Sequence, residues 1–176
     1  YKTVLVRRWG LGGQETEGVT NKLGFDFFFG HSCQRQACNY YPRYLWKDTI
    51  KVWLNNELII PGTKDKKVKL PKGADQKDEN SYSAFSSNEY APERMQKEAI
   101  AFIRENKEQP FFLYYATPIP HTALQAPKRW IDHYREKFGE EEPYLGEKNY
   151  FPARYPHATY AAMVSYLDEQ VGELVT

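Results

Sequence analysis

The sequence Thr117 to Pro127, TPIPHTALQAP, places a histidine between prolines directly after an aromatic run. That run, Phe111 to Ala116, has the length and aromatic content of a core strand, and Pro118 and Pro120 cannot continue a sheet ladder. His121 is therefore expected on a loop at the C-terminal end of a strand. In open α/β sheets ligands bind at that edge, because the loops there diverge around a crevice. The alternative role for His121 is to cap or fill the loop.

Two cysteines, Cys33 and Cys38, are further residues that could react or bind a metal. They stand in HSCQRQAC, and on a helix five positions apart they point in different directions. A lone C-x4-C with His31 nearby lacks the paired spacing of a structural zinc site. We therefore expect free, partly buried thiols, which do not indicate a redox compartment.

Composition restricts the class of protein. The chain has 176 residues, 41% apolar and 27% charged, which fits one globular domain and argues against disorder, collagen or a membrane span. Its 24 basic and 23 acidic residues are scattered, so no basic stripe indicates nucleic acid and no basic amphipathic helix indicates a membrane surface. The aromatic share is 16%, and Tyr and Trp can line sugar or aryl sites, although packing in a core is their commoner role.

The elements that must position His121 alternate between strands and helices. A strand is expected from Thr3 to Val6, a glycine-rich turn from Gly10 to Gly13, and a second strand from Gly24 to Gly30. The segments DTIKVWL and ELIIPG flank Asn55-Asn56, a pair that tolerates the positive φ of a hairpin turn. Pro61 to Asn88 is rich in Lys, Asp, Gly and Ser, which predicts a surface loop.

Three later segments carry apolar stripes at helical spacing and begin near Pro92, Pro127 and Ala158. The stripes are Met95, Ala99, Phe102 and Ile103; Trp130, Ile131, Tyr134 and Phe138; and Tyr160, Met163, Val164, Leu167, Val171 and Leu174. Strands alternating with amphipathic helices predict an α/β fold with a mainly parallel sheet flanked by helices on both faces.

Both ends of the chain look cut. The sequence opens within two residues of a buried-looking strand and stops at Thr176 while a helical pattern is still running. We therefore expect a partial sheet, incomplete at both ends, from a longer protein. Exposed strand edges and apolar faces would favour association.

Four segments resemble, in order, the sulfatases of the alkaline-phosphatase superfamily, in particular the bacterial arylsulfatase-like branch. They are YKTVLVRRWGLGG, GFDFFFGHSCQRQACNYYPRYLWKD, PFFLYYATPIPHTALQAP and YAAMVSYLDEQVGEL. The resemblance implies the alkaline-phosphatase-like sulfatase fold, with residues 1–176 as the central part of one catalytic domain and a hairpin and surface-loop excursion at about 44–90. It also implies sulfate-ester hydrolysis by a formylglycine nucleophile, made from the Cys or Ser of a C/S-x-P-x-R motif, beside a bound calcium.

The resemblance places two residues of this chain in the site. His121 falls on the family's histidine in its Pro-His loop, which contacts the sulfate group near the leaving oxygen. Arg8 takes the place of a lysine in G-K-W-H-L-G that bridges nucleophile and sulfate, and Gly10 takes the place of a histidine. Arg8 keeps the positive charge with a different geometry, whereas Gly10 cannot transfer protons. We therefore expect His121 and Arg8 to be catalytic and substrate-binding residues.

The nucleophile and the metal ligands are not found in this sequence. Neither Cys33 nor Cys38 begins a C/S-x-P-x-R motif, so formylglycine is expected outside this chain. Calcium takes six to eight oxygen ligands, and no acidic cluster supplies them, so its ligands are also expected outside the chain. Asp168 is expected to be structural or solvent-facing.

The substrate class and the alternatives follow from the same resemblance. The substrate would be a sulfated small molecule or a sulfated carbohydrate, and NYYPRYLW, residues 39–46, would face the leaving group or pack beneath the sheet. One alternative is a phosphodiesterase or phosphonate hydrolase of the same superfamily, in which metals replace formylglycine. Another is a non-catalytic remnant or glycan-binding module. Relatives are commonly exported, so the full-length protein is expected to be periplasmic or secreted.

Overall fold

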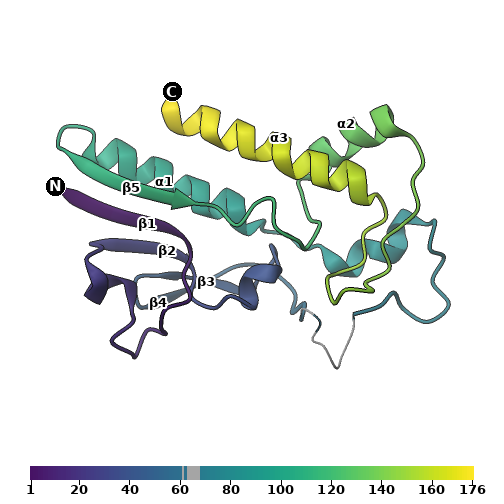
Figure 1. Cartoon of the computed structure of the whole chain (residues 1–176), viewed down its shortest axis with the longest axis horizontal. Coiled ribbons are helices and arrows are strands. Elements are labelled where there is room, and N and C mark those ends of the chain that lie inside the picture. The colour runs from purple at the N-terminus through teal and green to yellow at the C-terminus, as the bar shows by residue number, and fades with distance from the viewer. Residues whose placement is uncertain (61, 63–67) are drawn as a thin grey trace.

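The computed structural model describes residues 1–60, 62 and 68–176, and its strands form one sheet in the order β4-β3-β2-β1-β5 (Figure 1). The strands are β1 (Lys2–Arg8), β2 (Phe27–His31), β3 (Tyr44–Lys47), β4 (Ile50–Trp53) and β5 (Phe111–Ala116). β1 runs parallel to both of its neighbours, β2 and β5, whereas β3 and β4 form an antiparallel hairpin beside β2. The predicted α/β fold is confirmed, with the parallel part of the sheet formed by β1, β2 and β5.

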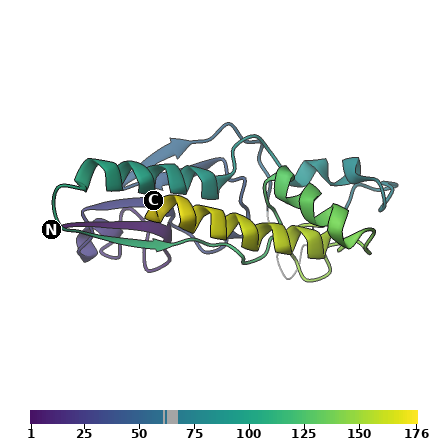
Figure 2. The same ribbon diagram turned by 90° about the horizontal axis from the view of Figure 1, so that it is seen from above.

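The described residues form three α-helices, two of which lie side by side along the sheet (Figure 2). They are α1 (Ala91–Asn106), α2 (Lys128–Phe138) and α3 (Pro156–Val175). Helix α1 buries Met95, Ala99 and Phe102 against the sheet, as its spacing predicted, and Leu174 of α3 packs against the same cluster. Helices α1 and α3 therefore cover one face of the sheet, which we call the helix face, whereas α2 packs against α3.

The opposite face of the sheet is covered by a loop where helices were expected. Leu5 and Phe28 are fully buried there against Trp9, which follows β1, and Phe25 packs on the same cluster. The Trp9 indole is fixed by donating a hydrogen bond to the Gly18 carbonyl at 2.7 Å. The segment 9–26, which contains the short 3₁₀ helix Thr20–Leu23, therefore takes the place of an α-helix on this face.

The hairpin lies earlier in the chain than the sequence predicted. It joins β3 to β4 through Asp48, which has a φ of 52°, and not through Asn55-Asn56. The Asn56 amide instead donates to the Pro42 and Glu89 carbonyls, at 2.8 Å each, and its oxygen accepts from the Glu89 N–H. These contacts, distant in sequence, hold the asparagines in a connection, so no strand forms at residues 57–60.

The predicted surface loop from Pro61 to Asn88 is only partly within the described residues, since 61 and 63–67 lie outside them. Its later part forms a 3₁₀ helix, Glu79–Phe85, which buries Tyr82 and Phe85. These rings pack with Ala123 and Phe151 in a separate hydrophobic cluster. The interpretation as a surface loop is wrong for this part, because two aromatic residues three positions apart share one face of the 3₁₀ turn.

Strand β5 and helix α3 differ from their predicted burial. β5 lies at the end of the sheet, and Phe112 and Tyr114 are 51% and 43% exposed. On α3 the buried stripe runs through small and polar residues, with Gln170 donating to the Pro92 carbonyl of α1 at 3.0 Å. Of the predicted stripe, Met163 is buried, whereas Tyr160, Val164 and Val171 are exposed. The other buried residues of α3 are Ala158, Thr159, Ala162, Tyr166 and Gln170.

None of the helices in the described ranges is long and apolar enough to span a bilayer. The exposed apolar residues of β5 and α3 are consistent with the expected association, which stays a prediction.

The close approach of β2 to β1 predicts the first mutational effect. Gly30 has a φ of 149°, and a Cβ there would lie 2.0 Å from the Arg7 carbonyl oxygen. We expect Gly30→Ala to lower the free energy of unfolding by about 3 kcal/mol, because strain and overpacking add at this position. Gly13→Ala is the matched control, since nothing lies within 4 Å of its Cβ position. Equal urea midpoints for the two variants would contradict the assigned pairing of β1 and β2.

Candidate functional site

The C-terminal ends of β1, β2 and β5 meet at one edge of the sheet because the three strands are parallel (Figure 1). Arg8 is the last residue of β1 and pairs in register with His31, the last residue of β2. Val6 and Phe29, two positions earlier, are buried on the helix face. Because side chains alternate along a strand, Arg8 and His31 lie side by side on that same face.

His121 lies on the loop that follows β5, as the sequence predicted. Its backbone N–H donates to the Pro118 carbonyl at 2.9 Å. The buried Tyr40 hydroxyl lies 3.0 Å from the Pro118 carbonyl oxygen and 2.5 Å from that of His121. Burial raises the pKa of Tyr40, so its hydroxyl remains a donor that holds the loop against the segment after β2.

The His121 ring is exposed and has a defined orientation. Its Nδ1 lies against the Thr122 carbonyl oxygen, and the Tyr150 ring meets it edge-on, with centroids 5.9 Å apart and planes at 76°. Because a carbonyl oxygen can only accept, Nδ1 carries a proton in this arrangement. Nε2 is therefore the ring nitrogen left to hold or release a second proton.

Arg8 is a half-buried cation whose guanidinium makes no hydrogen bond or ion pair within the described residues. Its charge acts to lower the pKa values of three neighbours, His31, Cys38 and Tyr40. Burial raises the pKa of Cys38 and of Tyr40, and the Arg8 charge opposes both effects. Arg8 therefore lies close to the segment that reaches the His121 loop, although no direct contact between Arg8 and His121 is found in the described part of the chain.

His31 is a residue of this edge that the sequence analysis missed. It is fully buried, and neither ring nitrogen has a hydrogen-bond partner in the described ranges. Burial, and then the charge of Arg8, lower its pKa to about 4. His31 is thus a neutral imidazole beside Arg8. The sequence feature that could have indicated His31 was its position at the end of the predicted strand in GFDFFFGH.

An unpaired cation beside neutral or donating groups is suited to bind an anion. The carboxylates and thiols are arranged differently: among the described residues no three His, Cys, Asp or Glu side chains could hold a metal ion together. The ligand set that calcium requires therefore does not fit the described residues, and we derive no step through calcium. Cys33 and Cys38 are free; Cys38 is half-buried as expected, whereas Cys33 is exposed. Asp168 is exposed, in agreement with the second of its two expected roles.

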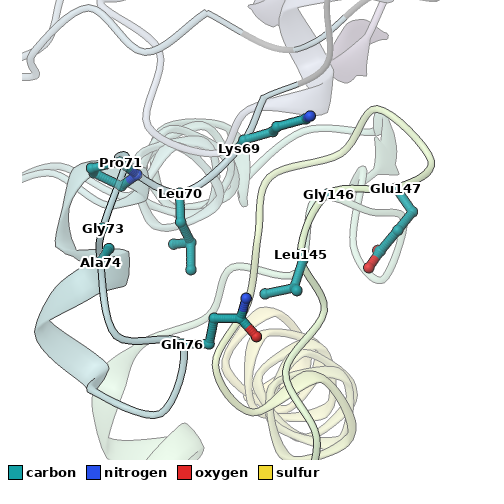
Figure 3. Close-up of a pocket in the computed structure, with 9 residues that line it drawn as sticks. All are labelled: Lys69, Leu70, Pro71, Gly73, Ala74, Gln76, Leu145, Gly146 and Glu147. Carbon is teal, nitrogen blue, oxygen red and sulfur yellow. The ribbon is translucent and has the colours of Figure 1, made fainter.

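Two cavities lie elsewhere on the molecule. One of about 490 Å³ separates the loop of Leu70, Pro71 and Gln76 from Leu145 and Glu147 (Figure 3). The other, of about 610 Å³, lies between the 3₁₀ helix Glu79–Phe85, α2 and the segment 152–155. Neither cavity is lined by Arg8, His31 or His121.

The fold is that of an α/β protein with a half-buried, unpaired arginine at the C-terminal ends of the described parallel strands. A crystal structure of Ps i-CgsB in complex with k-i-k-neocarrahexaose has the same fold, with a TM-score of 0.57 and 21% identity over 99% of this chain. A sequence profile of the sulfatase family matches residues 1–176. The chain belongs to the sulfatase family, and its fold is alkaline-phosphatase-like.

Among curated proteins, the chain is similar to arylsulfatase J of Mus musculus, with 27% identity over 171 residues. The match covers 97% of this chain and 23% of the relative. The match to Ps i-CgsB likewise covers 33% of that protein. The chain thus spans a quarter to a third of the lengths of these two proteins.

Buried, neutral His31 predicts a pH dependence of stability. Its pKa is about 4 in the folded chain and 6.5 when unperturbed, so the unfolded state binds more protons between these values. Its contribution is complete above pH 6.5 and falls by about 3 kcal/mol as the pH drops to 4. In urea unfolding, His31→Phe should lose less stability than the unaltered chain over this window. His133→Phe, which replaces an exposed histidine, is the control and should lose as much stability as the unaltered chain. An equal dependence of the unfolding free energy on pH in all three proteins would refute the burial of His31.

Proposed function

We propose that this chain is part of a sulfuric ester hydrolase, in which Arg8 and His121 bind the sulfate group at the C-terminal edge of β1 and β5. The observation that carries the proposal is the half-buried guanidinium of Arg8, which lacks a counterion in the described structure at the edge of a sulfatase-family sheet. A sulfate group would supply the missing negative charge.

Arg8 is suited to bind the sulfuryl oxygens. Its planar guanidinium can donate two parallel hydrogen bonds to two oxygens of one sulfate group, which fixes orientation as well as charge. Arg8 stands where the family has lysine, so its contact is forked where an ammonium would act as a point charge. Because its pKa is lowered, His31 is neutral and adds no positive charge beside Arg8.

His121 is suited to act on the leaving oxygen. Cleavage of a sulfate ester places negative charge on the sulfuryl oxygens and on the departing alkoxide. With Nδ1 held by the Thr122 carbonyl, a second proton on Nε2 can be donated to the leaving oxygen. Tyr40, which fixes the backbone of this loop, is a positioning residue for His121.

The nucleophile and the calcium ligands are proposed to lie outside this chain. Neither Cys33 nor Cys38 has the sequence context of a formylglycine precursor, and the described residues offer no ligand set for calcium. The lengths of arylsulfatase J and Ps i-CgsB support a larger catalytic domain, of which residues 1–176 form the central part and 44–90 an excursion.

A sulfated small molecule or a sulfated carbohydrate is the proposed substrate class. Arylsulfatase J supports the first by its name, and Ps i-CgsB, crystallised with a neocarrahexaose, supports a carbohydrate. Of residues 39–46, Tyr40 and Tyr41 are buried, whereas Tyr44 and Trp46 are half-buried on the hairpin. Tyr40 and Tyr41 pack with Ile119 and Met163, and not beneath the sheet.

Inorganic sulfate should stabilise the chain through Arg8. At ten times the dissociation constant, a ligand that binds only the native state adds about 1.4 kcal/mol to stability. We expect sulfate, compared with chloride at equal ionic strength, to raise the melting temperature of the unaltered chain by more than that of Arg8→Ala, because sulfate also stabilises folded proteins in general. Arg104→Ala, which removes an exposed arginine of α1, should keep the full effect. Equal protection of Arg8→Ala would remove Arg8 from the site.

In the longer protein, His121→Ala should lower kcat/KM for an aryl sulfate by a factor on the order of 10² to 10⁴, because proton donation to the leaving oxygen is lost. The ring is exposed, so thermal unfolding should change little. His133→Ala, in an exposed histidine of α2, is the control and should retain activity. A His121→Ala enzyme with unchanged kcat/KM would show that another group assists the leaving oxygen.

A further inference from the structure

The β3–β4 hairpin carries a group of aromatic and basic side chains that the proposed function does not use. Tyr44 pairs in register with Trp53, and Trp46 with Lys51. Leu45 belongs to the hydrophobic cluster of the helix face. Because side chains alternate along a strand, the side chains of these two pairs lie on the opposite face. We call Tyr44, Trp46, Lys51 and Trp53, together with Arg43, the hairpin platform.

The rings of the hairpin platform surround one ammonium group. Lys51 Nζ lies 4.8 Å from the Tyr44 ring centroid, 5.4 Å from that of Trp46 and 5.9 Å from that of Trp53. Arg43 Cζ lies 5.7 Å from the Trp53 ring centroid. Tyr44 meets Trp46 and Trp53 at 88° and 64°. The rings therefore hold both cations in place by cation–π attraction.

The two cations of the platform have no carboxylate partner. Within the described ranges, neither Arg43 nor Lys51 forms an ion pair, whereas the adjacent Lys47 pairs with Glu98 at 3.1 Å. A ring face attracts a cation without neutralising its charge. Arg43 and Lys51 therefore keep a positive potential beside Trp53, which is 62% exposed.

The platform lies at the same edge of the sheet as Arg8. Trp46 pairs with Gly30, next to the end of β2, so Tyr44 and Trp53 lie at the end of the hairpin nearest to His31. In the strand order, β4 is separated from β1 by three strand spacings. At about 4.8 Å per spacing, the two sites are about 14 Å apart along the edge. The platform lies on the face opposite to that of Arg8, so one oligosaccharide would have to pass around the edge to reach both.

We propose that the hairpin platform binds an outer residue of a sulfated oligosaccharide. The apolar C–H face of a pyranose would stack on the exposed indole of Trp53, while Lys51 and Arg43 would bind its sulfate groups. Successive nucleic-acid bases would need parallel ring faces, and the steep ring angles do not provide them. The choice of a sulfated carbohydrate rests on the proposed function, but binding at the platform requires no catalysis.

Binding can be measured by titration calorimetry on the 176-residue chain with a heparin hexasaccharide, its desulfated form and a single-stranded oligonucleotide. Trp53→Ala should raise the Kd for the sulfated hexasaccharide on the order of tenfold, since it removes the stacking surface. Lys51→Gln should weaken binding of the sulfated form only. Tyr160→Ala and Lys97→Gln, which alter an exposed aromatic and an exposed lysine elsewhere, are the matched controls.

The platform would be refuted by an unaltered Kd in Trp53→Ala, by absence of hexasaccharide binding, or by an equal dependence of oligonucleotide binding on Trp53. The last outcome would assign the surface to nucleic acid. Protection by inorganic sulfate through Arg8 tests the proposed function separately, because Trp53→Ala leaves Arg8 in place. If sulfate protected Arg8→Ala as well as the unaltered chain while hexasaccharide binding depended on Trp53, the proposed function alone would be contradicted. If hexasaccharide binding did not depend on Trp53 while sulfate protection depended on Arg8, the platform alone would be contradicted.

Discussion

The parallel pairing of β1 with both β2 and β5 is the constraint on which the candidate site depends. It brings the ends of three strands to one edge, although β5 follows β1 by more than a hundred residues in sequence. The pairing with β2 requires Gly30, since any Cβ there would meet the Arg7 carbonyl. The position of the Arg8 backbone is therefore set by strand pairing.

The C-terminal edge of β1 and β2 holds polar groups without hydrogen-bond partners in the described chain, and such groups lower the stability of the fold. Arg8 is half-buried without a counterion in the described chain, and both nitrogens of buried His31 lack a partner there. Polar groups removed from water without hydrogen bonds are costly, and such exceptions concentrate where a protein binds or reacts. By contrast, the Pro118 and His121 carbonyls of the His121 loop accept hydrogen bonds from Tyr40, which suits the proposed role of this loop in presenting one ring nitrogen.

The sequence was sufficient where structure follows local pattern. Strands β1, β2 and β5, helix α1 and the position of His121 after β5 were predicted, because strand composition, helical spacing and proline act over a few residues. It failed where distant contacts decide: Glu89 holds Asn56 and moves the hairpin turn to Asp48. His31 was missed because its importance comes from its register with Arg8, which periodicity does not reveal. The roles of Arg8 and His121 stay predictions.

The central claim, that Arg8 and His121 form one anion site, can be tested by nuclear magnetic resonance. Isotope-labelled chain would be titrated with sodium sulfate while the Arg8 Nε–H and the His121 imidazole resonances are followed. The account predicts that both shift with a single dissociation constant, while Arg104 and His133 do not respond. Sulfate-dependent shifts centred on Arg154 or Lys128 at the larger cavity, with Arg8 and His121 unchanged, would contradict it.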